Sequence, residues 1–330
     1  GYSMKSKNIP ADIKSKSIKE AQNEIKEIIT NLENTETNLE ESMDKYNRMM
    51  QLNYHIQEQY KKKLKEIKGS DFNNDKKYYA MLIGNNKYDY WTDLTSPIND
   101  ITAIAKILRK KYKFEVPNIL KNATKNEIED AFASIRPQIV DLQTGEYVDP
   151  SIVGKTKALD YDQRKASKDP KQSSVLDSGD DIASIKRRVR YAKVYLVEEQ
   201  GNTKTIILPV SGYGLWSTLH GFLALENDAN TVVGLGFYEH AETPGLGGEV
   251  DNPRWKAIWP GKKVFDLAKG NAPQIKLLKG SVDKTRASAI YEVDGLSGAT
   301  LTSRGITNLV QFWTGEHGFQ KYLDRLRKEV

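Results

Sequence analysis

The chain contains no cysteine among its 330 residues. This absence excludes disulfide bonds, thiolate metal sites, iron–sulfur ligation and a cysteine nucleophile. Only four histidines are present, and His220 and His240 are too few and too scattered to predict a metal site. No run of about 18 to 20 apolar residues is found, and the N-terminus lacks an apolar signal core, so we expect a soluble chain without a membrane anchor.

The charge also lacks a strong bias. The formal net charge is +6, and basic residues alternate with acidic ones along most of the sequence. No concentrated basic surface is indicated, so we expect no nucleic-acid partner. The length allows about two or three domains of ordinary size.

Glycine is scarce in the first part of the chain. Only three of the 23 glycines precede residue 130, and this early part is rich in Lys, Asn, Ile and Glu. The later part has the Gly, Pro and Trp content of a loop-rich domain. We expect three segments: a helical arm (1–70), a small α/β fragment (71–132) and a larger α+β domain (133–330).

The arm is predicted to be helical from residue 13 to residue 68. Apolar residues recur there at steps of three, four and seven, and neither Gly nor Pro interrupts the run from Asp12 to Lys68. One long helix and an antiparallel pair bent near Asn34–Asn38 both fit this pattern. The arm serves either as a solvated, coiled-coil-like element that self-associates or as a helix that binds a specific partner.

The fragment that follows carries a first resemblance. An apolar run ends at Gly84-Asn85-Asn86, and Pro97-Ile98-Asn99-Asp100 starts a predicted helix. These motifs resemble the opening of caspase-like peptidase domains over about 55 residues. The catalytic Cys of that family has no counterpart here, so we expect a truncated fragment without peptidase activity.

The larger domain is predicted to hold a mixed or antiparallel sheet with helices. Strands are expected at 136–147, 191–198, 205–210 and 231–238, and helices at 304–314 and 317–328. A short helical stretch is expected to open at Gly214-Leu215-Trp216 and to continue through Phe222.

The most informative stretch runs from Asp294 to Ser303. One interpretation is that Thr302 or Ser303 caps a helix beginning near Arg304 and that the glycines shape a turn. The other is phosphate attachment, since small residues leave the backbone accessible and Thr300 offers a hydroxyl that can form a phosphoester. A helix N-terminus beside that hydroxyl would favour a phosphate.

Residues 133–330 resemble the C component of the Na+-translocating NADH:quinone oxidoreductase. The most specific segments are Gly214–Ser217, Glu242–Val250, Asn252-Pro253 and Asp294–Thr302. The resemblance implies that Thr300, the last residue of Ser-Gly-Ala-Thr, carries FMN covalently through its phosphate. A related component of the Rnf complex has a similar stretch and is the alternative family.

The resemblance also suggests further cofactor-binding positions near Thr300 and in a second loop. Leu246 is expected to cover one face of the flavin ring, although a tight loop serving only the fold is the alternative. Trp216 either stacks near the flavin or packs in the core. Glu242 and Glu249 either bond the ring edges or stabilise the loop. The expected positions besides Thr300 are Ser297, Gly298, Ala299, Leu301, Thr302, Thr243, Gly245, Leu246, Gly247 and Trp216.

The implied function is electron transfer, because bound flavin supplies the redox chemistry and the protein only places and tunes it. No catalytic base or nucleophile is needed, and no activity is expected of the isolated chain. The resemblance implies other subunits of the complex as partners, a flavin transferase that uses FAD and Mg2+, and a location on the periplasmic side of the inner membrane. A scaffold protein with an unloaded flavin fold is the alternative from another functional class.

Overall fold

The computed structural model describes residues 9–34, 39–67, 81–84, 118–121 and 135–329. The chain forms two compact units. The first joins residues 1–70 with 137–330, and the second comprises residues 71–136. Among the described helices, none combines the length and the apolarity needed to cross a bilayer.

The arm is an antiparallel pair of helices, preceded by the short helix α1 (Ala11–Lys14). The pair consists of α2 (Ile18–Asn34) and α3 (Leu39–Ile67), called the hairpin below. Partners along the two helices run in opposite order, since Arg48 contacts Glu24 while His55 contacts the Lys16 carbonyl. The antiparallel alternative is therefore correct. The buried side chains recur at helical spacing and are Ala21, Ile25, Ile29, Met49, Leu52 and Ile56.

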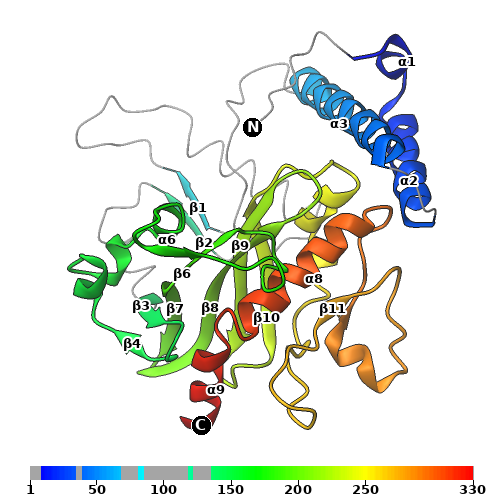
Figure 1. The fold of residues 1–330 in the computed structure, drawn as a ribbon. Helices are drawn as coiled ribbons and strands as arrows, with labels where there is room; N and C mark the ends of the chain where they lie inside the picture. The colour runs from blue at the N-terminus through cyan, green and yellow to red at the C-terminus, as the bar shows by residue number, and fades with distance from the viewer. Residues whose placement is uncertain (1–8, 35–38, 68–80, 85–117, 122–134, 330) are drawn as a thin grey trace, which may run out of the picture. The chain divides into compact units, whose positions relative to one another are not determined.

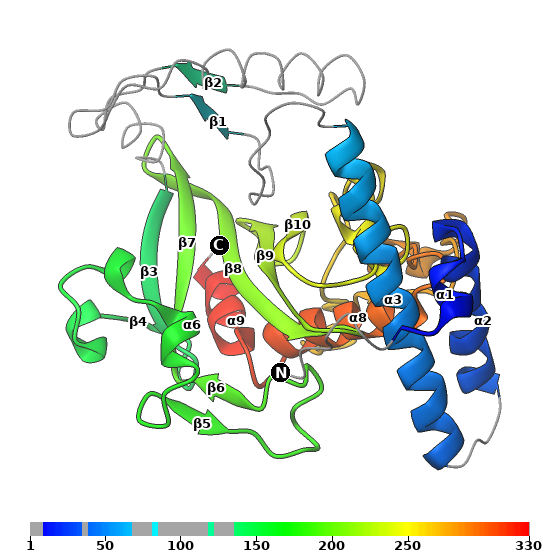
Figure 2. The same cartoon turned by 90° about the horizontal axis from the view of Figure 1, so that it is seen from above.

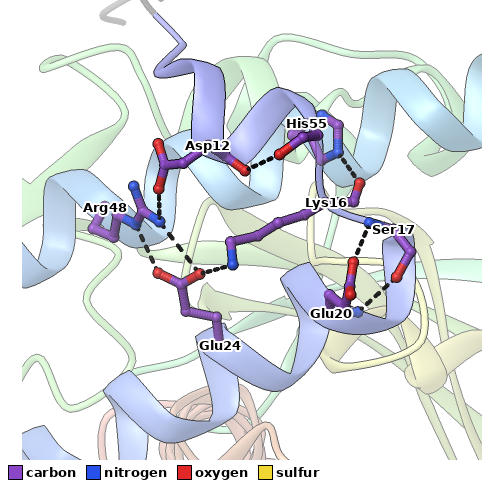
Figure 3. Close-up of polar contacts among 8 residues, drawn as sticks. Asp12, Lys16, Ser17, Glu20, Glu24, Arg48 and His55 are labelled. Carbon is purple, nitrogen blue, oxygen red and sulfur yellow. Dashed lines mark hydrogen bonds and ion pairs between the residues drawn. The ribbon is translucent and has the colours of Figure 1, made fainter.

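Polar contacts fix the start and the register of the hairpin (Figure 3). Ser17 and Glu20 form a reciprocal capping box, in which the Ser17 N–H donates to Glu20 Oε2 at 2.7 Å and the Glu20 N–H donates to Ser17 Oγ at 3.2 Å. The Arg48 guanidinium lies between Glu24 and Asp12, at 2.7 and 2.6 Å. It holds the pKa of both carboxyls below their usual range.

The larger domain is built on a six-stranded sheet with the order β10-β9-β8-β7-β3-β4. The β7–β8, β8–β9, β9–β10 and β3–β4 pairs are antiparallel. Strands β8 and β9 alternate buried and half-exposed residues, so one sheet face forms the core. The strands are β3 (Ile135–Asp141), β4 (Tyr147–Val148), β7 (Tyr191–Glu199), β8 (Asn202–Tyr213), β9 (Thr218–Glu226) and β10 (Val232–Glu239).

Two helices lie along one face of this sheet (Figures 1 and 2), namely α8 (Thr300–Thr314) and α9 (Gln320–Glu329). Helix α8 packs closely on β8, because a Cβ at Gly212 would lie 2.4 Å from Leu309 Cβ. Trp313 Nε1 donates to the Ser211 carbonyl at 2.7 Å. The expected α+β fold is confirmed.

Short elements connect this framework. Before β7 lie η2 (Pro150–Val153), η3 (Ala158–Asp160), α6 (Gln163–Ala166), β5 (Ser173–Val175) and β6 (Arg187–Val189). Between β10 and α8 lie η4 (Gly247–Asp251), α7 (Pro253–Lys256), β11 (Lys276–Leu277), η5 (Ala287–Tyr291) and β12 (Glu292–Val293). In this second group Trp255 and Trp259 are buried and meet edge to face, with ring centroids 5.6 Å apart, as expected of packing residues.

The prediction of a helix that opens at Gly214-Leu215-Trp216 is wrong. The stretch through Phe222 is not helical, because Thr218 to Glu226 forms strand β9. Buried positions alternate along it, and Gly221 occupies one of them. A Cβ at Gly221 would lie 2.2 Å from the Gly236 carbonyl oxygen of β10, so glycine allows the two strands to approach.

The second unit contains a parallel pair formed by β1 (Met81–Gly84) and β2 (Asn118–Lys121). The first strand ends at Gly84, where the apolar run of the sequence stops. The helix expected to start at Pro97-Ile98-Asn99-Asp100 lies outside the described residues.

Candidate functional site

Thr300 is the first residue of α8. The helix therefore begins four residues earlier than the sequence indicated, at Thr300 rather than near Arg304. Ala299 precedes it with φ −136° and ψ 52°, and no side chain caps the helix N-terminus. The first N–H groups of a helix lack partners within the helix, so they remain available to an acceptor placed there.

The hydroxyls of Thr302 and Ser303 do not cap this helix, contrary to the first interpretation of the sequence. Ser303 Oγ accepts a hydrogen bond from the Leu296 N–H at 3.0 Å. Thr302 Oγ1 donates to Glu242 Oε2 at 2.5 Å. Both side chains are buried, so the first turn of α8 is tied to the 294–299 loop and to Glu242.

Glu242 connects three segments of the site. Its carboxyl group accepts hydrogen bonds from the N–H groups of Leu215 and Trp216, both at 3.1 Å, as well as from Thr302. The residue is only 4% exposed. Glu242 is thus committed to protein partners, whereas Glu249 is half-exposed and accepts from the Asn252 side chain.

The 242–248 loop folds back on itself beside Trp216. The Thr243 carbonyl accepts from the N–H groups of Leu246 and Gly248, at 3.0 and 2.8 Å. Trp216 Nε1 donates to Thr243 Oγ1 at 2.8 Å, so the indole ring is fixed against the loop. Gly245 has φ +76°, a conformation that glycine adopts without strain.

The 294–299 loop is held by neighbouring backbone and by one indole. Trp255 Nε1 donates to the Asp294 carbonyl at 2.9 Å, and Asp294 Oδ1 accepts from the Val282 N–H at 2.7 Å. Gly298 has φ +65°. In the resulting arrangement Ser297 is exposed, Thr300 is half-buried and Ala299 is buried.

Similarity to known proteins decides the family. The chain is 56% identical over 203 residues to the C component of the Na(+)-translocating NADH-quinone reductase of Pseudomonas aeruginosa, covering 61% of this chain and 75% of that protein. Identity to the same component of Vibrio parahaemolyticus is 45% over 223 residues, covering 67% and 82%. The crystal structure of Shewanella oneidensis NqrC matches with a TM-score of 0.55 and 33% identity, over 71% of this chain and all of that one. The chain belongs to the NqrC family.

Models of three protein families match different parts of this chain. The FMN-binding domain matches residues 214–315, which include the 242–248 loop, the 294–299 loop and Thr300. The caspase domain matches residues 77–141, in line with the resemblance of the second segment. The exonuclease VII small subunit matches residues 19–68, which form the hairpin.

The hairpin supplies residues to the site that sequence reasoning missed. Asn53 Oδ1 accepts from Thr243 Oγ1 at 2.6 Å, and Gln22 Nε2 donates to the Pro244 carbonyl at 3.0 Å. The rings of Tyr46 and Trp216 lie 5.8 Å apart, centroid to centroid. No local signal links these helices to loops about 200 residues later, so only the folded chain reveals the contacts.

A separate cavity of about 760 Å³ opens on the sheet face beside α6. Lys193, His220 and Tyr238 line it, and none of its lining residues belongs to the 242–248 or 294–299 loop. Burial lowers the pKa of His220, and nearby Arg164 adds to this effect.

His240 contacts Asp251 at 3.0 Å. Within the described part of the chain, no group of three or more possible ligands is placed to hold a metal ion.

Proposed function

We propose that this chain carries FMN covalently on Thr300 and acts as the electron-transferring C component of a Na+-translocating NADH:quinone reductase. The observation that carries the proposal is the position of the Thr300 hydroxyl on the first residue of α8, in a helix start that no side chain caps. A phosphate ester formed there would meet the positive end of the helix dipole and its free N–H groups.

The neighbouring residues fit a phosphate and its loading enzyme. Ser297, Gly298 and Ala299 are small, and Ser297 is exposed. Thr302 and Leu301 continue the first turn, where their N–H groups face the same end of the helix. In the proposed loading step, the threonine oxygen bonds to the flavin-side phosphorus of FAD, AMP leaves, and the hydroxyl proton is released.

The flavin ring is proposed to lie against the 242–248 loop and Trp216. Thr243, Gly245, Leu246 and Gly247 would form one side of that place, and bound FMN would supply the one-electron chemistry. Glu242 would act indirectly, because its carboxyl group already fixes the backbone of Leu215 and Trp216.

The proposed partners are the other subunits of the reductase and a flavin transferase, with the flavin domain on the periplasmic side of the inner membrane. We keep the division of the chain into an arm (1–70), an α/β fragment (71–132) and a flavin domain (133–330) as a proposal. Self-association of the arm stays a prediction, and much of the apolar stripe that would mediate it is buried within the chain.

Replacement of Thr300 tests the attachment. The chain would be co-expressed with a flavin transferase, denatured, and examined by intact mass and in-gel flavin fluorescence. We expect Thr300→Val to lose all covalent flavin, because a methyl group replaces the hydroxyl, and Thr300→Ser to retain it. A Val variant that keeps flavin after denaturation would disprove the assigned site.

A further inference from the structure

The hairpin occupies the surface on which the proposed flavin ring would lie. Asn53 accepts a hydrogen bond from the Thr243 hydroxyl, and Gln22 donates one to the Pro244 carbonyl, both in the 242–248 loop. The two residues come from different helices of the hairpin, α3 and α2. Polar groups that a ligand would use are therefore already bonded within the chain.

The same helices fill the space next to two glycines. A Cβ at Gly245 would lie 2.4 Å from Gln22 Nε2, and a Cβ at Gly298 would lie 2.3 Å from Lys26 Cε. Bare backbone at such positions allows a ligand to approach closely. Here side chains of α2 lie against that backbone, one against each proposed flavin-binding loop.

The indole of the proposed ring site is covered as well. Tyr46 of α3 lies against Trp216, with the ring centroids 5.8 Å apart. A flavin ring placed beside Trp216 would need that same surface, and Leu246 is only 2% exposed in this arrangement. The ring and the docked hairpin therefore compete for one place.

The hairpin is held together by contacts of its own. Its capping box, the ion pairs of Arg48 and the bond from His55 to the Lys16 carbonyl all lie within residues 12–55. These contacts do not involve the flavin domain, so the two helices can leave it as one body. Among the described residues, the polar contacts between the hairpin and the flavin domain include the hydrogen bonds of Asn53 and Gln22 and the pair of the half-buried Glu33 with the exposed Lys279 at 3.3 Å.

We infer that the α2–α3 hairpin is an intramolecular cap that excludes the flavin ring, so that attachment of FMN at Thr300 requires the cap to leave. This inference rests on the proposed function, because it concerns the same loops and the same hydroxyl. It goes beyond that function by assigning the arm a regulatory role, in which cap release sets the rate of loading.

A zero-length cross-link reports docking directly. A carbodiimide joins a carboxylate to an amine in contact, and Glu33 Oε2 lies 3.3 Å from Lys279 Nζ. In the full, unloaded chain we expect to find the peptide that is cross-linked through these two residues. After loading with FAD and a flavin transferase, we expect the yield of this peptide to fall roughly tenfold. Equal cross-linking in unloaded and flavin-bearing chain would overturn the inference and leave the proposed function intact.

Loading rate gives the second measurement. The variant Gln22→Ala/Asn53→Ala removes two bonds of the cap, and its matched control is Asn23→Ala/Asn47→Ala, at exposed positions of the same two helices. We expect loading to accelerate roughly tenfold in the first variant, the change that one to two net hydrogen bonds make to an equilibrium. The control is expected to load as the parent chain does.

The outcomes separate the two proposals. Unchanged loading in the Gln22→Ala/Asn53→Ala variant, with flavin attached, would overturn the cap alone. If neither the parent chain nor any variant takes up covalent flavin, the proposed function and the cap fall together. If the Glu33–Lys279 cross-link still forms when no variant takes up flavin, the hairpin is docked but has no role in excluding a flavin.

Discussion

The hairpin and the 242–248 loop are stabilised in different ways. Around Arg48 the hairpin uses ion pairs whose side chains retain 22% to 59% exposure. The loop uses the buried Glu242, whose carboxyl group accepts three hydrogen bonds from two other segments. Exposed pairs contribute little each, whereas a buried group that loses its partners is costly. The loop is therefore fixed by one buried carboxyl group, while the polar contacts that link the hairpin to the flavin domain include the two hydrogen bonds of Asn53 and Gln22 and the pair of Glu33 and Lys279.

Glu242→Ala tests the buried side of this comparison and has the largest expected effect. It leaves the N–H groups of Leu215 and Trp216 and the Thr302 hydroxyl without their acceptor. A typical hydrogen bond contributes about 1 kcal/mol net and three are lost, so we expect the free energy of unfolding to fall by roughly 3 kcal/mol in urea titrations. Half-exposed Glu249→Ala is the control, and a similar loss in both variants would contradict the assigned role.

Gly247→Ala tests the close packing around Glu242. An added Cβ would lie 2.5 Å from Thr302 Oγ1 and 2.8 Å from Glu242 Oε2. Overpacking of this kind costs about 1 to 3 kcal/mol, and we expect roughly 2 kcal/mol from the same titrations. Gly234→Ala adds a Cβ with nothing within 4 Å and should be neutral or slightly stabilising. If Gly247→Ala leaves the free energy of unfolding as unchanged as Gly234→Ala does, the loop accommodates the added methyl group and the packing argument is wrong.

Arg48→Met tests the exposed side. It removes the ion pairs to Glu24 and Asp12 while keeping an apolar stem. Partly exposed pairs are worth about 0.2 to 1 kcal/mol, so we expect faster amide hydrogen exchange in α2 and α3 and unchanged exchange in β8 and β9. Lys61→Met, which removes a more exposed pair with Glu58, should change neither region. Faster exchange throughout the sheet would contradict independent stability of the hairpin.

Acid provides the smallest and most selective perturbation. Hydrogen bonding from Arg48 lowers the pKa of Glu24 and of Asp12. A carboxyl with a lowered pKa in the folded chain stabilises it above the usual pKa, and this contribution disappears as pH falls through and below about 4. We expect exchange in α2 to rise over that range in the parent chain, and to rise less in Arg48→Met. The same rise in both would show that other groups dominate.

The sequence allowed much of the sheet to be predicted, and its failures have physical causes. Alternation identified β7 because Ala192, Val194 and Leu196 share its buried face. The same alternation in β9 was hidden, because Gly221 stands at a buried position where only glycine fits against Gly236. The start of α8 was missed because its first turn contains polar residues, and the buried Thr302 and Ser303 find their partners in distant loops.

The candidate site divides in the same way. Thr300 and both loops could be selected by resemblance, since their residues are contiguous and specific. The participation of Asn53 and Gln22 could not, because hydrogen-bond partners separated by 190 and 222 residues leave no local pattern. Whether the arm is one helix or two also depended on tertiary contacts, since its periodicity fitted both.

Those sequence separations have a consequence for the newly made chain. The hairpin leaves the ribosome before its docking loops, which emerge about 200 residues later. At about 5 to 20 residues per second, the interval is on the order of ten seconds or more. During that interval Gln22 and Asn53 cannot yet bond to Pro244 and Thr243, so the nascent arm is open to chaperones and to neighbouring copies. Translation speed thus sets how long the arm spends exposed before its own domain can receive it.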